Sequence, residues 1–173
     1  MTITSSPECP QASQEARSAT EPHDQPVCAT VLGLDCSSTT IGWCVHDGQV
    51  RDAGTLRLTG SDIAERCRQA RAGVYLILLN HPDVDAVAIE SPVCRFAKAL
   101  IPQARVSGAV LALLAEKQIA WCEVTPSEAK HAATGRGNAS KADMMTAAGL
   151  DDEHAADAVG VAKAALKHVQ VLR

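Results

Sequence analysis

The stretch that decides the fold is Ala29-Thr-Val-Leu-Gly-Leu-Asp35, an apolar run ending in a carboxylate, with Ile41-Gly-Trp-Cys-Val45 after a turn rich in Ser and Thr. Both runs have the apolar and β-branched residues that are typical of buried strands. His46-Asp47-Gly48 supplies a hairpin turn, and Val50 to Leu58 then predicts a third strand. We therefore expect the fold to begin with an antiparallel meander.

Helical and strand patterns alternate after the meander. Apolar residues at helical spacing and apolar runs predict, in chain order, a helix over Ser61–Leu79, a strand over Asp85–Glu90, a helix over Ala97–Lys117 and a strand over Ile119–Val124. Capping signals predict three further helices, which begin at Thr125, Ser140 and Asp151, the last extending to about His168. Because a helical crossover makes the strands it joins parallel, the pattern predicts an α/β fold. Its core would be a mixed five-stranded sheet, an antiparallel meander plus parallel strands, flanked by helices.

The first 28 residues differ in composition from the rest of the chain. They are rich in Ser, Thr, Pro, Gln and Glu, carry four acidic residues against a lone Arg17, and have no hydrophobic period. We expect residues 1–28 to be a disordered acidic tail. The remaining residues, 29–173, have the length of one domain with a core of its own.

The composition excludes a membrane-spanning protein. The 173 residues are 46% hydrophobic and 21% charged, and no apolar stretch approaches the length of a bilayer. We expect a cytoplasmic protein, bacterial or in a host cell if phage-encoded, because no signal peptide is recognisable. The seven cysteines form no Cys-x-x-Cys pair, which indicates reduced thiols.

Four side chains suggest a metal site. Asp35 and Glu90 each end a strongly apolar strand, and His154 and Asp157 are three residues apart on the last predicted helix, so that they share one face. Carboxylates at such positions favour a cation, and this donor set suits Mg²⁺ or Mn²⁺. Two such ions would suit phosphodiester hydrolysis. Each residue alone also has an ordinary explanation: a turn former, a charged strand end, a partly exposed helix residue and an acid at a helix start.

A basic segment lies inside this acidic chain, whose formal net charge is −4. Between residues 91 and 141 the basic residues outnumber the three glutamates, and they are Arg95, Lys98, Arg105, Lys117, Lys130, Arg136 and Lys141. Lys and Arg neutralise phosphates, so this segment is where we expect a nucleic-acid contact. Its candidate DNA-binding residues by charge are Arg95, Lys98, Lys130, Arg136 and Lys141.

Four blocks of the sequence resemble, in order and spacing, those of the RuvC Holliday-junction resolvases, which have an RNase H-like fold. The blocks are Leu32-Gly-Leu-Asp-Cys-Ser-Ser-Thr-Thr-Ile-Gly-Trp43, Ala88-Ile-Glu-Ser91, residues 124–141 and His154-Ala-Ala-Asp-Ala158. The resemblance spans about Val31 to His168. It implies an endonuclease that acts as a homodimer on branched DNA, especially four-way junctions, and leaves 5′-phosphate and 3′-hydroxyl ends.

The same resemblance implies roles for single residues. Asp35, Glu90 and Asp157 match the family's catalytic carboxylates, and His154 stands where members have either Asp or His. Lys130 and Lys141 match basic residues near the scissile phosphate, and Lys141 is expected to act in catalysis. Phe96 stands near an aromatic residue that stacks on unpaired bases, although Ser91-Pro92-Val93 departs from the family's usual run.

Other functions fit parts of the pattern. Asp35-Cys-Ser-Ser-Thr-Thr-Ile-Gly42 also resembles the first phosphate loop of actin and sugar-kinase ATPases, but those proteins need a second lobe for which this chain is too short. A branched-DNA binding module and an RNA-processing relative of the same fold stay open. The helix over Ala97–Lys117 has an apolar stripe that could serve either a dimer interface or the core, made of Ala99, Val106, Val110, Leu111 and Leu114. We expect Trp43 and Trp121 to be core residues.

Overall fold

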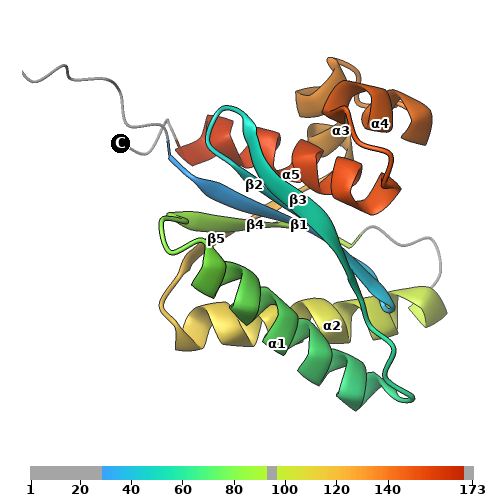
Figure 1. Ribbon diagram of the computed structural model, residues 1–173. Helices are drawn as coiled ribbons and strands as arrows, with labels where there is room; N and C mark the ends of the chain where they lie inside the picture. The colour runs from blue at the N-terminus through green and yellow to red at the C-terminus, as the bar shows by residue number, and fades with distance from the viewer. Residues whose placement is uncertain (1–28, 93–96, 170–173) are drawn as a thin grey trace, which may run out of the picture.

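A computed structural model describes residues 29–92 and 97–169, which form one mixed sheet with helices on both faces (Figure 1). The strand order is β3-β2-β1-β4-β5. The strands are β1 (Val31–Cys36), β2 (Thr40–His46), β3 (Val50–Arg57), β4 (Ala86–Glu90) and β5 (Ala120–Val124). β1, β2 and β3 pair antiparallel, and β4 and β5 run parallel to β1. The predicted fold class is confirmed.

Two layers of helices cover the sheet (Figure 1). One face carries α1 (Ile63–Asn80) and α2 (Ala97–Glu116), and the other carries α3 (Pro126–Thr134), α4 (Lys141–Ala148) and α5 (Glu153–Val169). The face toward α1 and α2 has a core of large side chains such as Leu32, Leu34 and Ile41. The face under α5 is filled mainly by alanines and valines, so α5 packs close to the strands.

Local sequence signals set the starts of the C-terminal helices. The predicted capping box at Thr125 is present in α3, and Ser140 and Asp143 form a second one that opens α4. The predicted start of the last helix is wrong by one residue. Asp152, not Asp151, caps α5, because its Oδ1 accepts a hydrogen bond from the Ala155 amide at 3.0 Å.

The two tryptophans differ in burial. Trp43, on the interior strand β2, packs against the core of the α1–α2 face. Trp121 is 46% exposed, so its assignment to the core is wrong. The reason is topological: β5 is an edge strand, where the sheet covers a side chain from one side only.

Two further expectations from the sequence concern the N-terminal segment and membrane-spanning helices. Residues 1–28, the predicted acidic tail, lie outside the described residues, so their expected disorder stays a prediction. Within residues 29–92 and 97–169, no helix has the combination of length and apolarity that crossing a bilayer requires.

Candidate active site

Two of the predicted acids lie side by side at one end of the sheet. β1 and β4 are parallel neighbours, and Leu34 pairs with Ile89. The residues that follow this pair, Asp35 and Glu90, therefore lie at the carboxyl ends of the two neighbouring strands. Both side chains are partly buried. The sheet therefore brings together two carboxylates that are far apart in the sequence.

The third element of the site is the N-terminal part of α5. His154 Nδ1 lies 3.3 Å from Asp35 Oδ2, and Asp157 follows three residues later on the same helix. The structure thus connects the strand-end acids to the predicted His–Asp pair of the last helix.

Glycines allow α5 to come this close. A Cβ at Gly42, opposite Asp35 in the register of β1 and β2, would lie 1.9 Å from the His154 carbonyl oxygen. A Cβ at Gly33 would lie 2.5 Å from the Ala158 carbonyl oxygen. The helix backbone therefore rests directly on strand backbone that has no side chain. Gly42 is a site-forming residue that was not predicted, although glycine within a strand often marks a close backbone approach.

The carboxylates act on one another electrostatically. Burial raises the pKa of Glu90, and the negative charge of Asp35, a side-chain hydrogen bond with Asp35 and the charge of Asp157 raise it further. Burial, followed by the charges of Asp35 and Glu153, raises the pKa of Asp157 to about 6. These acids share one region of low polarity, and their ionised forms repel each other.

The donor chemistry of this region fits a hard divalent cation, because it consists of carboxylate oxygens and one imidazole. Across residues 29–92 and 97–169, however, no three His, Cys, Asp or Glu side chains converge in an arrangement that would hold a metal ion. A cation between these carboxylates would remove the repulsion that raises the pKa values of Glu90 and Asp157.

The structure brings two of the predicted basic residues to these acids. Lys130 on α3 lowers the pKa values of both Glu90 and Asp157 through its charge. Lys141, the first residue of α4, also lowers the pKa of Asp157 and forms an ion pair with Glu153. Glu153 is not among the predicted site residues, and its only signal in the sequence is its place in the first turn of a helix.

Two other predicted DNA-binding residues lie at the surface. Arg136 is exposed and pairs with Asp143 at 3.3 Å, and Lys98 is exposed on α2. Arg95 and Phe96 lie outside the described residues, so their roles stay predictions.

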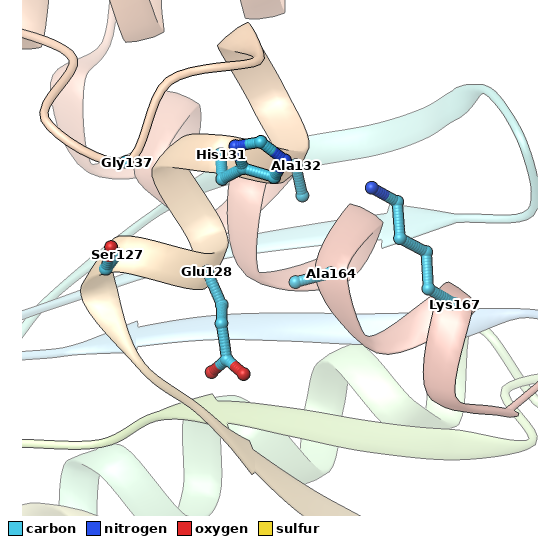
Figure 2. Close-up of a pocket in the computed structure, with 7 residues that line it drawn as sticks. All are labelled: Ser127, Glu128, His131, Ala132, Gly137, Ala164 and Lys167. Atoms are coloured by element: carbon cyan, nitrogen blue, oxygen red, sulfur yellow. The ribbon is translucent and has the colours of Figure 1, made fainter.

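The structure also has a groove of about 460 Å³, which lies between α3 and α5 and does not include the acids of the candidate site (Figure 2). Its lining includes Ser127, His131 and Lys167, and none of the predicted site residues takes part in it. Lys167 is 13 residues beyond His154 on α5, which is roughly 20 Å along a helix. The groove is therefore separate from the acidic region.

A mixed sheet whose central strands end in acids beneath an acid-bearing C-terminal helix defines the class of RNase H-like nucleases. Within that class, the family model described as crossover junction endodeoxyribonuclease RuvC matches residues 31–168. The chain belongs to the RuvC family of crossover junction endodeoxyribonucleases.

Individual relatives agree with this assignment. A crossover junction endodeoxyribonuclease RuvC from Parvibaculum lavamentivorans is 30% identical over 154 residues, covering 79% of this chain and 86% of that protein. The solved structure of Thermus thermophilus RuvC has a TM-score of 0.66 at 23% identity, covering 82% of this chain and 96% of that one. A structure of the same protein in complex with Holliday junction substrate has a TM-score of 0.67 at 20% identity, with the same coverage. These two structures establish the fold.

Proposed function

We propose that this chain resolves four-way DNA junctions by metal-dependent phosphodiester hydrolysis at the site formed by Asp35, Glu90, His154 and Asp157. The observation that carries the proposal is the contact of Asp35 with His154 at 3.3 Å, at the sheet edge where Glu90 and Asp157 also respond to the charge of Asp35. The product ends would be a 5′-phosphate and a 3′-hydroxyl.

The four residues would hold Mg²⁺ or Mn²⁺, with two ions per site. When bound, such a pair supplies an activated water and stabilises the leaving oxygen. The chain's own contribution is to hold the donors on two strands and one helix of a single core. Partial burial of Asp35, whose side chain is 15% exposed, limits competition from bulk water.

Two lysines would contact the DNA near the cut. The Lys141 ammonium is drawn to the same acids, because Asp157 and Asp35 add to the effect of Glu153 in raising its pKa. It is therefore a full positive charge at the rim of the site, suited to a non-bridging phosphate oxygen. Lys130 is partly buried beside Glu90 and Asp157, so it would contact only a phosphate that lies close to these two acids. Arg136 and Lys98, with Arg95 and Phe96, would contact DNA further away.

A homodimer would provide two sites, one for each strand that is cut. Part of the exposed surface of α2 supports this proposal: Ile101 is 51% exposed, and the small residues Ala104, Gly108 and Ala112 are exposed as well, beside the charged residues Lys98, Arg105 and Glu116. Small residues allow two helices to approach closely. The apolar stripe of the sequence prediction serves the core, because Val106, Val110 and Leu114 are buried there. The interface proposed here is therefore the opposite side of α2.

The test is cleavage of an immobile four-way junction, a linear duplex and an RNA–DNA hybrid, each with Mg²⁺, Mn²⁺ or a chelator. We expect paired, metal-dependent cuts in the junction alone. Asp35→Asn should abolish cutting and keep junction binding, whereas Asp47→Asn, an equally conservative change in the exposed β2–β3 turn, should leave cutting unchanged. Full activity of Asp35→Asn would disprove the site.

The same assay separates the alternatives. Junction binding without cutting would favour a branched-DNA binding module, and cutting of the hybrid alone would favour an RNA-processing enzyme. The kinase-like alternative is not favoured, because the family match covers the whole segment from β1 to α5, including the loop that resembles a phosphate loop.

A further inference from the structure

Two arginines flank the turn that follows Asp35. Arg66, on the first turn of α1, donates a hydrogen bond from Nη1 to the Ser38 carbonyl oxygen at 3.2 Å. Arg57, the last residue of β3, pairs in register with Thr40, where β2 begins. The Arg66 side chain and the backbone of Arg57 are thus placed at the end of the sheet where β1 ends after Asp35.

Neither arginine has an acidic partner in the part of the chain that the structure describes. Several others do: Arg51 pairs with Asp83, Arg68 with Glu65, Arg71 with Glu116 and Arg136 with Asp143. The Nε of Arg66 is buried without a hydrogen-bond partner. A guanidinium has five N–H donors, and a cation that is partly removed from water gains from an anion beside it.

The arginines and the lysines lie on different sides of Asp35. In the strand order, β3 and β4 are on opposite sides of β1, so Arg57 is separated by β2 and β1 from Glu90, which lies near Lys130. Arg66 comes from α1, on the sheet face opposite α3 and α4, which carry Lys130 and Lys141 (Figure 1). Asp35 therefore lies between two groups of positive charge.

We infer that Arg57 and Arg66 form a second phosphate-binding point for the DNA strand that is cut, across Asp35 from Lys130 and Lys141. The inference rests on the proposed function, because it requires a DNA backbone at Asp35. Every nucleotide carries one charge, so a strand with one phosphate at Asp35 extends further phosphates to both sides. Guanidinium groups suit this role because their planar fork binds two oxygens of one phosphate.

The test measures junction affinity of the full chain as a function of salt, with chelator present to prevent cutting. Arg57→Gln and Arg66→Gln should each weaken binding about tenfold and reduce the slope of log K against log salt by about 1. Arg68→Gln is the matched control: Arg68 is on the same helix, is exposed and pairs with Glu65, so affinity and slope should not change.

A second variant separates phosphate binding from support of the turn. Arg66→Lys keeps the charge but loses the geometry of the bond to Ser38, so the salt slope should stay near that of the wild type. A slope that falls in Arg66→Lys as much as in Arg66→Gln would assign Arg66 to the turn alone.

Other outcomes are equally decisive. A wild-type slope in both Arg57→Gln and Arg66→Gln would overturn the inference, and Arg57→Gln keeps it testable if Arg66→Gln fails to fold, because Arg57 is exposed. A wild-type chain that neither binds nor cuts the junction would instead refute the proposed function itself.

Discussion

Replacing Gly42 by alanine should displace the helix that carries His154. The new Cβ would lie 1.9 Å from the His154 carbonyl oxygen, whereas real Cβ contacts are essentially never under 3.0 Å, so the separation must grow by about 1.1 Å. The atom that must yield is backbone, which cannot rotate away as a side chain end can. The movement therefore falls on the residue whose Nδ1 lies 3.3 Å from Asp35.

Such a shift has consequences for both activity and stability. A misplacement of about 1 Å at a reacting centre can reduce the rate about 100-fold, and overpacking a core costs roughly 1–3 kcal/mol of unfolding free energy. We expect Gly42→Ala to show both losses, measured by junction cleavage under single-turnover conditions and by urea denaturation.

Gly54→Ala is the matched control for this prediction. Gly54 lies on the neighbouring strand β3, and the atoms nearest to its Cβ would be those of the Trp43 ring, at 3.1 Å, a contact that small shifts can relieve. Its cleavage rate should equal that of the wild type. The reasoning would be refuted if Gly42→Ala cut junctions at the wild-type rate, or if the two variants lost activity equally.

Three further predictions concern other residues. Lys141→Ala should slow junction cleavage about 100-fold, as the loss of a positioned charge at a phosphate does, without moving the thermal midpoint, because its exposed ion pair with Glu153 adds little stability; an unchanged rate would remove Lys141 from the site. The pKa of Asp157 is raised to about 6 in the folded chain, so its contribution to stability is present below its ordinary pKa of 3.8 and is lost as the pH rises through 6. The metal-free protein should therefore lose stability over this range, Mg²⁺ should restore it above pH 6, and Asp157→Asn should show a smaller loss; urea titrations at several pH values that were identical for the two proteins would contradict this prediction. Trp121→Ala should lower the free energy of unfolding less than Trp43→Ala does, because Trp121 is 46% exposed on an edge strand, and the reverse order in urea denaturation would show that its ring contributes more than its exposure indicates.

Most of the fold could be predicted because its signals are local. The apolar runs before Asp35 and Glu90 determine the two central strands, and the capping boxes at Thr125 and Ser140 determine where α3 and α4 begin. The error at Trp121 has another origin, since the alternation of side chains does not reveal which strand lies at an edge.

The candidate site could be predicted in part. The strand-end acids and the His154–Asp157 spacing are visible in the sequence, and the structure connects Asp35 with His154 directly. The contributions of Gly42 and Glu153 depend on how α5 lies against β2 and on how α4 lies beside α5. These are relations between elements far apart in the sequence, which no local spacing encodes.

The contact between Asp35 and His154 joins residues that are 119 positions apart. During synthesis, the chain emerges from the ribosome from its N-terminus, so β1 and β4 exist long before α5 does. A growing chain therefore contains the strand-end acids but lacks the helix that completes their surroundings. With the proposed site, the protein would acquire its capacity to cut DNA only with its last helix, and an unfinished copy would have none.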